Sequence, residues 1–236
     1  MNEPARDAST WIAEASHELR LPIANLKLLI ETLLDGAVDD PQACKRMLSR
    51  ANQEVERLER LVVDLLSIEQ AADSRHELRC QWNVLEDRAA YAVDSLKALA
   101  GERRVSVHVE IEPGWLVFAS PEQLDQVLLN LLENALKFTP EGGQVWIRSG
   151  QDPGSFAVED TGIGLSASEI PKIFERFYRV DRASSRGSTG LGLSIVKHIV
   201  DLHGAKISVL SEERRGSTFV LQFPGPQRMG RPCAPF

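Results

Sequence analysis

Cysteine is scarce in this sequence. Its 236 residues include 3 cysteines, an odd number, at the widely separated positions 44, 80 and 233. This spacing excludes a disulfide framework and a cysteine metal cluster, and it suits a reducing, cytoplasmic compartment.

Long apolar runs are missing as well. No stretch reaches the roughly 18 consecutive apolar residues of a membrane-spanning helix. The strongest candidate, Ile23–Leu34, is interrupted by Asn25, Lys27, Glu31 and Thr32. No secretory signal is visible either. We therefore expect no membrane contact within this chain.

A surplus of basic charge is the third absence. The formal net charge is −7 at pH 7, which excludes the basic face that a nucleic-acid partner requires. Hydrophobic residues make up 43% of the chain, so a packed core is feasible, and the length allows two modest domains.

Two stretches of the N-terminal third follow a heptad repeat. The first has one row of Ile12, Leu19, Leu26 and Leu33 beside a stripe of Ala15 and Leu29, flanked by Ile23 and Ile30. The second has one row of Cys44, Ala51, Leu58 and Leu65 and another of Leu48, Val55 and Val62. Each pattern predicts a long amphipathic helix.

A short turn joins these two helices. Asp35-Gly36 ends the first, and Asp40-Pro41 supplies an N-cap and a first-turn proline for the second. The result is an antiparallel hairpin. One hairpin cannot cover both apolar stripes, so we expect a homodimer that forms a four-helix bundle.

Beyond residue 69 the pattern changes. The polar stretch from Glu69 to Gln81 loses the periodicity and predicts a linker. Strands are then expected at 105–111, 144–149, 155–159, 206–210 and 217–223, and helices at 122–137 and 190–203. This mixture predicts an α+β fold, an α/β sandwich after the hairpin. The proline-rich end of the chain predicts a disordered tail.

The first candidate site is the string Ser-His-Glu-Leu-Arg-Leu-Pro at residues 16–22. The heptad puts His17 opposite the apolar seam, so its imidazole should be exposed. Neutral imidazole is a nucleophile near pH 7, and the adjacent Glu18 can fix its tautomer or accept a proton. A plain surface histidine is an equally good interpretation of this segment alone. His76 stands in the same His-Glu-Leu-Arg string, but without proline or heptads, which predicts a solvated linker residue.

The second candidate site lies in the helix expected at 122–137. Asn130, Asn134 and Lys137 stand at i, i+4 and i+7, and therefore share one helix face. Two amides and a lysine can hold a hydrated magnesium ion and reach phosphate oxygens. A solvated polar face explains the same pattern.

Two glycine-rich segments complete the set. Asp160-Thr161-Gly162-Ile163-Gly164 directly follows an expected strand, where glycines admit a flat ligand and a carboxylate can accept a hydrogen bond from an amine. A simple Asp-Gly turn is the alternative. Residues 187–193 open a helix and leave backbone donors for phosphate. Between them, residues 174–186 carry aromatics and arginines, which predicts a lid over an anionic ligand.

In this order the strings resemble the boxes of the histidine kinase family, most closely in wording the phosphate-regulon-type sensor kinases. The boxes are the phosphoacceptor string around His17, the asparagine string at Asn130–Asn134, Asp160–Gly164, Phe174–Phe177 and Gly190–Gly192. The resemblance spans roughly Trp11 to Phe223. It implies a dimerisation and phosphoacceptor domain at 1–72, a linker at 73–81, an ATP-binding catalytic domain at 82–224 and a tail at 225–236.

The resemblance also implies roles for individual residues and a partner. His17 would receive the phosphoryl group with help from Glu18, before transfer to an aspartate of a response regulator. Asn134 would ligate Mg²⁺, and Asp160 would bind the adenine amine of ATP. The other residues implied to bind the nucleotide are Asn130, Lys137, Phe138, Gly162, Gly164, Arg179, Thr189, Gly190, Leu191 and Gly192.

Two departures from the family pattern affect these expectations. Leu21 stands where the family usually has threonine or asparagine, and leucine cannot orient a water, which predicts weak phosphatase activity. Few residues precede the hairpin, whereas family members usually carry a sensor region, often membrane-bound. Two alternatives remain open: a conformational ATPase of the gyrase or Hsp90 type, and a degenerate kinase that only docks a regulator.

Overall fold

The computed structural model describes residues 3–73, 78–180 and 189–225, which form two compact units. His76, residues 181–186 of the expected lid and most of the expected tail lie outside these ranges. None of the helices in the described part combines the length and the apolar character that a membrane crossing requires.

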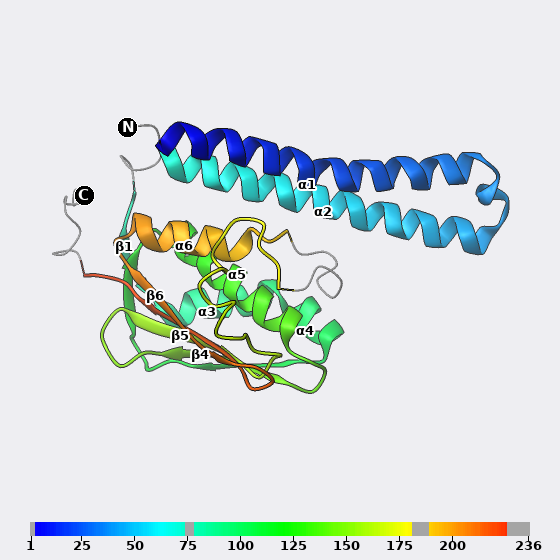
Figure 1. Cartoon of the computed structure of the whole chain (residues 1–236). Helices are drawn as coiled ribbons and strands as arrows, with labels where there is room; N and C mark the ends of the chain where they lie inside the picture. The colour runs from blue at the N-terminus through cyan, green and yellow to red at the C-terminus, as the bar shows by residue number, and fades with distance from the viewer. Residues whose placement is uncertain (1–2, 74–77, 181–188, 226–236) are drawn as a thin grey trace. The chain divides into compact units, whose positions relative to one another are not determined.

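The first unit is the predicted helical hairpin, drawn in blue and cyan in Figure 1. Helix α1 spans Glu3–Leu34, the 3-10 turn η1 spans Ala37–Asp39, and helix α2 spans Pro41–Asp73. Gly36 provides the turn with a φ of 114°, which favours glycine. The Asp40 carboxylate caps α2 by accepting hydrogen bonds from the amides of Gln42 and Ala43.

The end of α2 differs from the expectation. We expected the helix to stop near Glu69, but α2 continues to Asp73. Residues 69–73 are Glu-Gln-Ala-Ala-Asp, and most of them favour helix even without an apolar repeat. Loss of periodicity therefore did not mean loss of helix here. At the other end of the expected linker, Gln81 already belongs to a strand.

The second unit is an α/β sandwich. Its five-stranded sheet has the order β2-β4-β5-β7-β6, where β2 and β4 are parallel and all other neighbours are antiparallel. The strands are β2 (Ser106–Glu110), β4 (Gln144–Ser149), β5 (Ser155–Asp160), β6 (Lys206–Glu212) and β7 (Gly216–Gln222). All five were predicted from the sequence, with ends that differ by two residues or fewer.

Helices cover one face of this sheet (Figure 1). They are α3 (Leu85–Ser95), α4 (Lys97–Arg103), α5 (Pro121–Phe138) and α6 (Gly192–Leu202). The sequence predicted α5 and α6 but not α3 or α4. It also did not predict the two-stranded ribbon of β1 (Gln81–Val84) and β3 (Leu116–Ala119).

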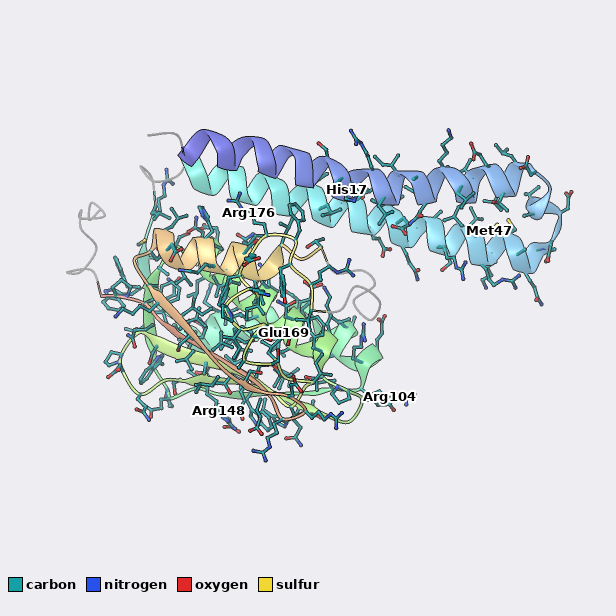
Figure 2. All side chains as sticks on the ribbon, viewed as in Figure 1. His17, Met47, Arg104, Arg148, Glu169 and Arg176 are labelled. Atoms are coloured by element: carbon teal, nitrogen blue, oxygen red, sulfur yellow. The ribbon has the colours of Figure 1, made fainter. Side chains whose placement is uncertain are left out.

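The core lies between α5 and the sheet. Buried side chains of α5 include Leu124, Leu128, Leu132 and Leu136, and those of the sheet include Val145, Ile147, Phe156, Val158 and Leu221. On the opposite face of the sheet, Arg148 forms ion pairs with Glu110 and Glu159 and lies over the ring of Trp146. Arg148 points away from the helices (Figure 2).

Candidate functional site

His17 lies on α1, and its side chain is exposed, as the heptad predicted. Glu18 is the next residue of the same helix. Helix α1 continues through Pro22, whose ring is buried. Leu21, one turn beyond His17, is 52% exposed in this hairpin. An exposed imidazole on a rigid helix is accessible to a reagent without any change of fold.

The polar face of α5 is half-buried. Ser120 caps the helix, and Asn130, Asn134 and Lys137 all have intermediate exposure. The Asn130 amide donates to the carbonyl of Gln126 at 2.9 Å, which leaves its Oδ1 pointing outward from the helix. This face is less solvated than an ordinary polar helix face, which favours a binding role over the bland alternative.

Lys137 has a partner that the sequence analysis did not consider. Its Nζ lies 2.8 Å from Oε1 of Glu133, and the two side chains are only 19% and 30% exposed. The face therefore also presents a carboxylate. A lysine held in this way has a defined position, and a hydrated cation nearby would find an acidic oxygen in addition to the amides.

The first turn of α6 packs against Asn130 and Asn134, which together form the asparagine face of α5. Gly192 begins α6, and a Cβ built on it would lie 2.9 Å from Oδ1 of Asn130 and 3.8 Å from Nδ2 of Asn134. A side chain at position 192 would push against the Asn130 amide. Glycine thus lets the N-terminus of α6 approach the two amides closely.

Asp160 is the last residue of β5 and is 7% exposed. Its Oδ1 accepts hydrogen bonds from the amides of Gly162, at 2.8 Å, and Ser217, at 3.3 Å. Burial raises the pKa of the Asp160 carboxyl to about 6, although these two bonds oppose the shift. A buried carboxylate fixed through one oxygen is well suited to accept a hydrogen bond from a ligand through the other.

The loop after Asp160 is pressed against the end of α5. A Cβ on Gly162 would lie 2.6 Å from Oδ1 of Asp160 and 2.7 Å from the carbonyl oxygen of Phe138. The amide of Ile163 donates to that same carbonyl. The loop therefore packs against the C-terminal end of α5, the helix that also carries Asn130 and Asn134.

The same loop also contacts the β6–β7 hairpin. Gly164 has a φ of 66°, and a Cβ there would overlap the carbonyl of Glu212. The sequence analysis missed Ser217, whose amide binds Asp160 from 57 positions away along the chain. The only local signal was a Gly-Ser pair at the start of an expected strand, which is common in proteins.

The other residues predicted to bind the nucleotide are Arg179, Thr189, Gly190 and Leu191. Arg179 is half-buried, Thr189 is buried, and Gly190 has a φ of 74°. Leu191 is fully buried, and its carbonyl accepts a hydrogen bond from Ser194. The predicted residues on or against α5 are thus Asn130, Asn134, Lys137, Phe138, Gly162 and Gly192. Asp160 is bonded to Gly162, Gly164 lies against Glu212, and His17 and Glu18 belong to the other unit.

Both units match known protein families. Residues 7–74 match the family described as the His Kinase A (phospho-acceptor) domain. Residues 119–227 match the family described as histidine kinase-, DNA gyrase B-, and HSP90-like ATPase.

Two curated relatives show how far the likeness extends. The phosphate regulon sensor protein PhoR of Pseudomonas aeruginosa is 34% identical over 225 residues, which cover 90% of this chain and 49% of PhoR. The sensor-like histidine kinase SenX3 of Mycolicibacterium smegmatis is 33% identical over 230 residues, which cover 94% of this chain and 60% of SenX3. The chain thus spans about half the length of these relatives.

Solved structures resemble the chain as well. The full-length kinase ShkA in complex with AMPPNP is 26% identical, with a TM-score of 0.66, and the match covers 91% of this chain and 45% of ShkA. The histidine kinase ThkA in complex with the response regulator TrrA has a TM-score of 0.76 and covers 96% of this chain and 64% of that one. At 24% identity, ThkA shows the shared fold alone.

Proposed function

This chain belongs to the family of two-component sensor histidine kinases, and we propose that it uses ATP to phosphorylate His17 and then passes the phosphoryl group to an aspartate of a response regulator. One observation carries the proposal: a buried carboxylate and a half-buried asparagine face meet around α5 in one unit, while an exposed histidine stands on the helical hairpin of the other.

Asp160 is the residue proposed to bind adenine. Its Oδ1 is held by the two backbone amides, so Oδ2 is the acceptor for the exocyclic amine of adenine. Gly162 keeps a side chain out of the space beside the carboxylate, Gly164 lets the loop approach the backbone of Glu212, and Phe138 supports the loop from the end of α5. The ionised carboxylate accepts this bond more strongly, and protonation turns Oδ2 into a donor, so adenine binding should weaken at low pH.

The asparagine face fits Mg²⁺ and phosphate. Asn134 is the proposed metal ligand and Asn130 its neighbour, since amide oxygens and a nearby Glu133 carboxylate are hard donors that suit this ion. When bound, Mg²⁺ neutralises phosphate charge. Lys137 and Arg179 are the proposed cationic contacts to phosphate. Thr189, Gly190, Leu191 and Gly192 supply backbone at the start of α6.

The proposed chemistry is in-line phosphoryl transfer. A nitrogen of neutral His17 attacks the γ-phosphorus, a P–N bond forms, and the P–O bond to ADP breaks, with its electron pair leaving on ADP. The ring then releases its remaining N–H proton, for which the adjacent Glu18 carboxylate is the acceptor.

Homodimerisation of the hairpin is part of the proposal. Ile23, Ile30, Leu48, Val55 and Val62 are all 42% or more exposed in the single hairpin. These residues belong to the heptad rows that one hairpin cannot cover, so a second copy would bury them in a four-helix bundle. Leu48→Glu with Val55→Glu should therefore give a monomer by light scattering. Leu28→Glu, which lies off these rows and is 62% exposed, is the matched control.

The response regulator is the proposed protein partner, and the cytoplasm the proposed compartment. The relatives are longer than this chain, so a sensor region, membrane-bound or soluble, would belong to the remainder of such a protein. The finer proposal of weak phosphatase activity rests on Leu21, whose exposed apolar side chain cannot hold a water.

Two other functions are less well supported. A conformational ATPase of the gyrase or Hsp90 type would need the nucleotide site but not the matched phosphoacceptor hairpin. A degenerate kinase that only docks a regulator would not need a complete set of asparagine, aspartate and glycine residues around α5.

Labelled ATP separates these functions. The purified chain is incubated with γ-labelled ATP and Mg²⁺, and the labelled protein is then treated with acid or alkali. A histidine kinase gives label that is lost in acid and survives alkali. Phosphate release without protein label would support the ATPase, and nucleotide-independent regulator binding without label would support the docking protein.

A further inference from the structure

A buried histidine joins two helices of the nucleotide unit at the end remote from the glycines. His203 follows the last residue of α6 and is 1% exposed. Its Nε2 accepts a hydrogen bond from the backbone amide of Ser120 at 3.1 Å, and its Nδ1 lies 2.9 Å from the carbonyl oxygen of Ile199. These two bonds define the tautomer, with the proton on Nδ1 and the acceptor on Nε2.

Ser120 is itself a fixed point. It is the N-cap of α5, and its Oγ accepts from the amide of Gln123. It follows Ala119, whose carbonyl accepts a hydrogen bond from the buried side chain of Asn83. The start of α5 is therefore held on one side by the β1–β3 ribbon and on the other by His203. The ring of His203 also packs edge-on against Phe223 at the end of β7.

The two helices run antiparallel, so this bridge sits opposite the functional end. From Ser120 to Asn130 and from His203 back to Gly192 the chain rises by about 15 Å in each helix. At the far end, Gly192 meets the Asn130 amide with no room for a Cβ. A slide of α6 along α5 would change that contact directly, because packed helices move as rigid units.

We propose that His203 is a positioning residue for the phosphate side of the nucleotide site, because its bridge to Ser120 sets the register of α6 on α5 and so holds Gly192 against Asn130 and Asn134. This rests on the proposed nucleotide site. His203 touches neither substrate nor metal. Its effect is confined to the part of the ligand next to the asparagine face, whereas adenine is held by Asp160, which is anchored in the sheet.

Two substitutions of His203 each retain only one of its two hydrogen bonds. Gln can place an acceptor where Nε2 stands and keep the bond from Ser120. Asn can keep a donor near Ile199, but it is too short to reach Ser120. Ile147→Val, in β4, removes one buried methyl from the core without touching either helix bridge, and serves as a control for lost stability.

The experiment measures the affinities of the full chain for ADP with MgCl2 and for adenosine, at a temperature where circular dichroism shows each variant folded. For His203→Asn, ADP affinity should fall about tenfold, as for a buried amide that loses its acceptor, while adenosine affinity changes less than twofold. His203→Gln should stay within about threefold of the wild type for both ligands. Ile147→Val should leave both unchanged.

Several results would overturn this inference. Wild-type ADP affinity in folded His203→Asn, equal losses for ADP and adenosine, or a loss in folded His203→Gln as large as in His203→Asn would each do so. If His203→Asn does not fold, His203→Gln alone still decides, since it must bind ADP nearly normally. Failure of the wild type to bind ADP would instead contradict the proposed function.

Discussion

The hairpin and the sandwich reach their functional residues by opposite routes. In the hairpin, His17 is exposed on a helix that the heptad alone specifies, so the nucleophile contributes little to folding. In the sandwich, Asp160 and Gly162 are buried among backbone atoms from α5 and β7. Substitutions at the proposed functional residues of the hairpin should therefore change activity without changing stability. Those in the sandwich should change both. Four substitutions test this difference.

The largest effect is expected for His17→Gln. Loss of the only proposed nucleophile should abolish protein labelling by γ-labelled ATP, while the melting temperature stays within about 2 °C, because exposed substitutions rarely exceed about 0.5 kcal/mol. His76→Gln, in the same His-Glu-Leu-Arg string, is the matched control and should label normally. Label that persists in the His17 variant would show that the phosphoacceptor is elsewhere.

Gly162→Ala should damage function and stability together. The added Cβ meets Oδ1 of Asp160 at 2.6 Å and the backbone carbonyl oxygen of Phe138 at 2.7 Å. The carboxylate is held by two backbone amides and the carbonyl ends a buried helix, so neither atom can move freely. We expect a loss of about 1–3 kcal/mol in the free energy of unfolding and at least about 100-fold in ATP affinity. Urea unfolding and calorimetric titration measure the two quantities.

Gly101→Ala is the control for that substitution. Gly101 lies inside α4, and a Cβ there has no neighbour within 4 Å. Alanine should leave ATP affinity unchanged and raise stability by up to about 1 kcal/mol, because glycine is a poor helix residue. If Gly162→Ala lowered ATP affinity but left the free energy of unfolding unchanged, function and stability would not be coupled at this residue.

Asp160→Asn should raise the stability of the fold while it lowers the affinity for ATP. Burial raises the pKa of this carboxyl from 3.8 to about 6, so the ionised form disfavours the folded state. That cost is absent below about pH 3, where the carboxyl is protonated in both states, grows between about pH 4 and pH 6, and is complete above about pH 6. The variant should therefore be more stable than the wild type at pH 7.5, by on the order of 1–3 kcal/mol, and about equally stable at pH 3.

The same variant should bind ATP less tightly. Asparagine can keep both backbone bonds through its Oδ1, but it places a donor where Oδ2 accepted the adenine amine. The expected cost is about 1–3 kcal/mol, or 5- to 150-fold in affinity at pH 7.5. Unchanged affinity would mean that adenine binds elsewhere, and unchanged stability that the carboxylate is better solvated than its 7% exposure indicates.

The smallest effect is expected on the exposed hairpin. Leu21→Thr introduces a hydroxyl one turn beyond His17 and should speed the loss of phosphate from a phosphorylated response regulator several-fold. Autophosphorylation should be unchanged, because it needs neither that side chain nor any packing change. Rapid dephosphorylation by the wild type, not increased by threonine, would show that leucine is no defect.

The sequence also predicted the hairpin more completely than the sandwich. The heptads and the Asp35–Pro41 turn predicted the hairpin, and α5 was predicted to within one residue at each end. The helix α3 was missed because its buried positions include the small residues Ala89 and Ala92, which give little apolar signal. Strands β1 and β3 were missed because four residues each are too short for a pattern.

The site was predicted as strings rather than as contacts. Asp160 and Gly162 were recognised because they are neighbours in the sequence. Their partners were not, since the Ser217 amide reaches Asp160 only after two hairpins have formed. The Lys137–Glu133 pair was a helical neighbour that the sequence offered and the analysis did not use. Buried His203 has no distinguishing sequence feature, because its bonds go to backbone atoms.

The position of β5 in the sheet has a consequence for hydrogen exchange. β5 lies at the centre, paired with β4 on one side and β7 on the other, whereas β2 and β6 form the edges. Amides on a central strand exchange with heavy water only when the sheet opens as a whole, and edge amides exchange through smaller openings. Asp160 stands at the end of this central strand, and the amides of Gly162 and Ser217 hold its Oδ1. The proposed acceptor for adenine should therefore stay in place between binding events.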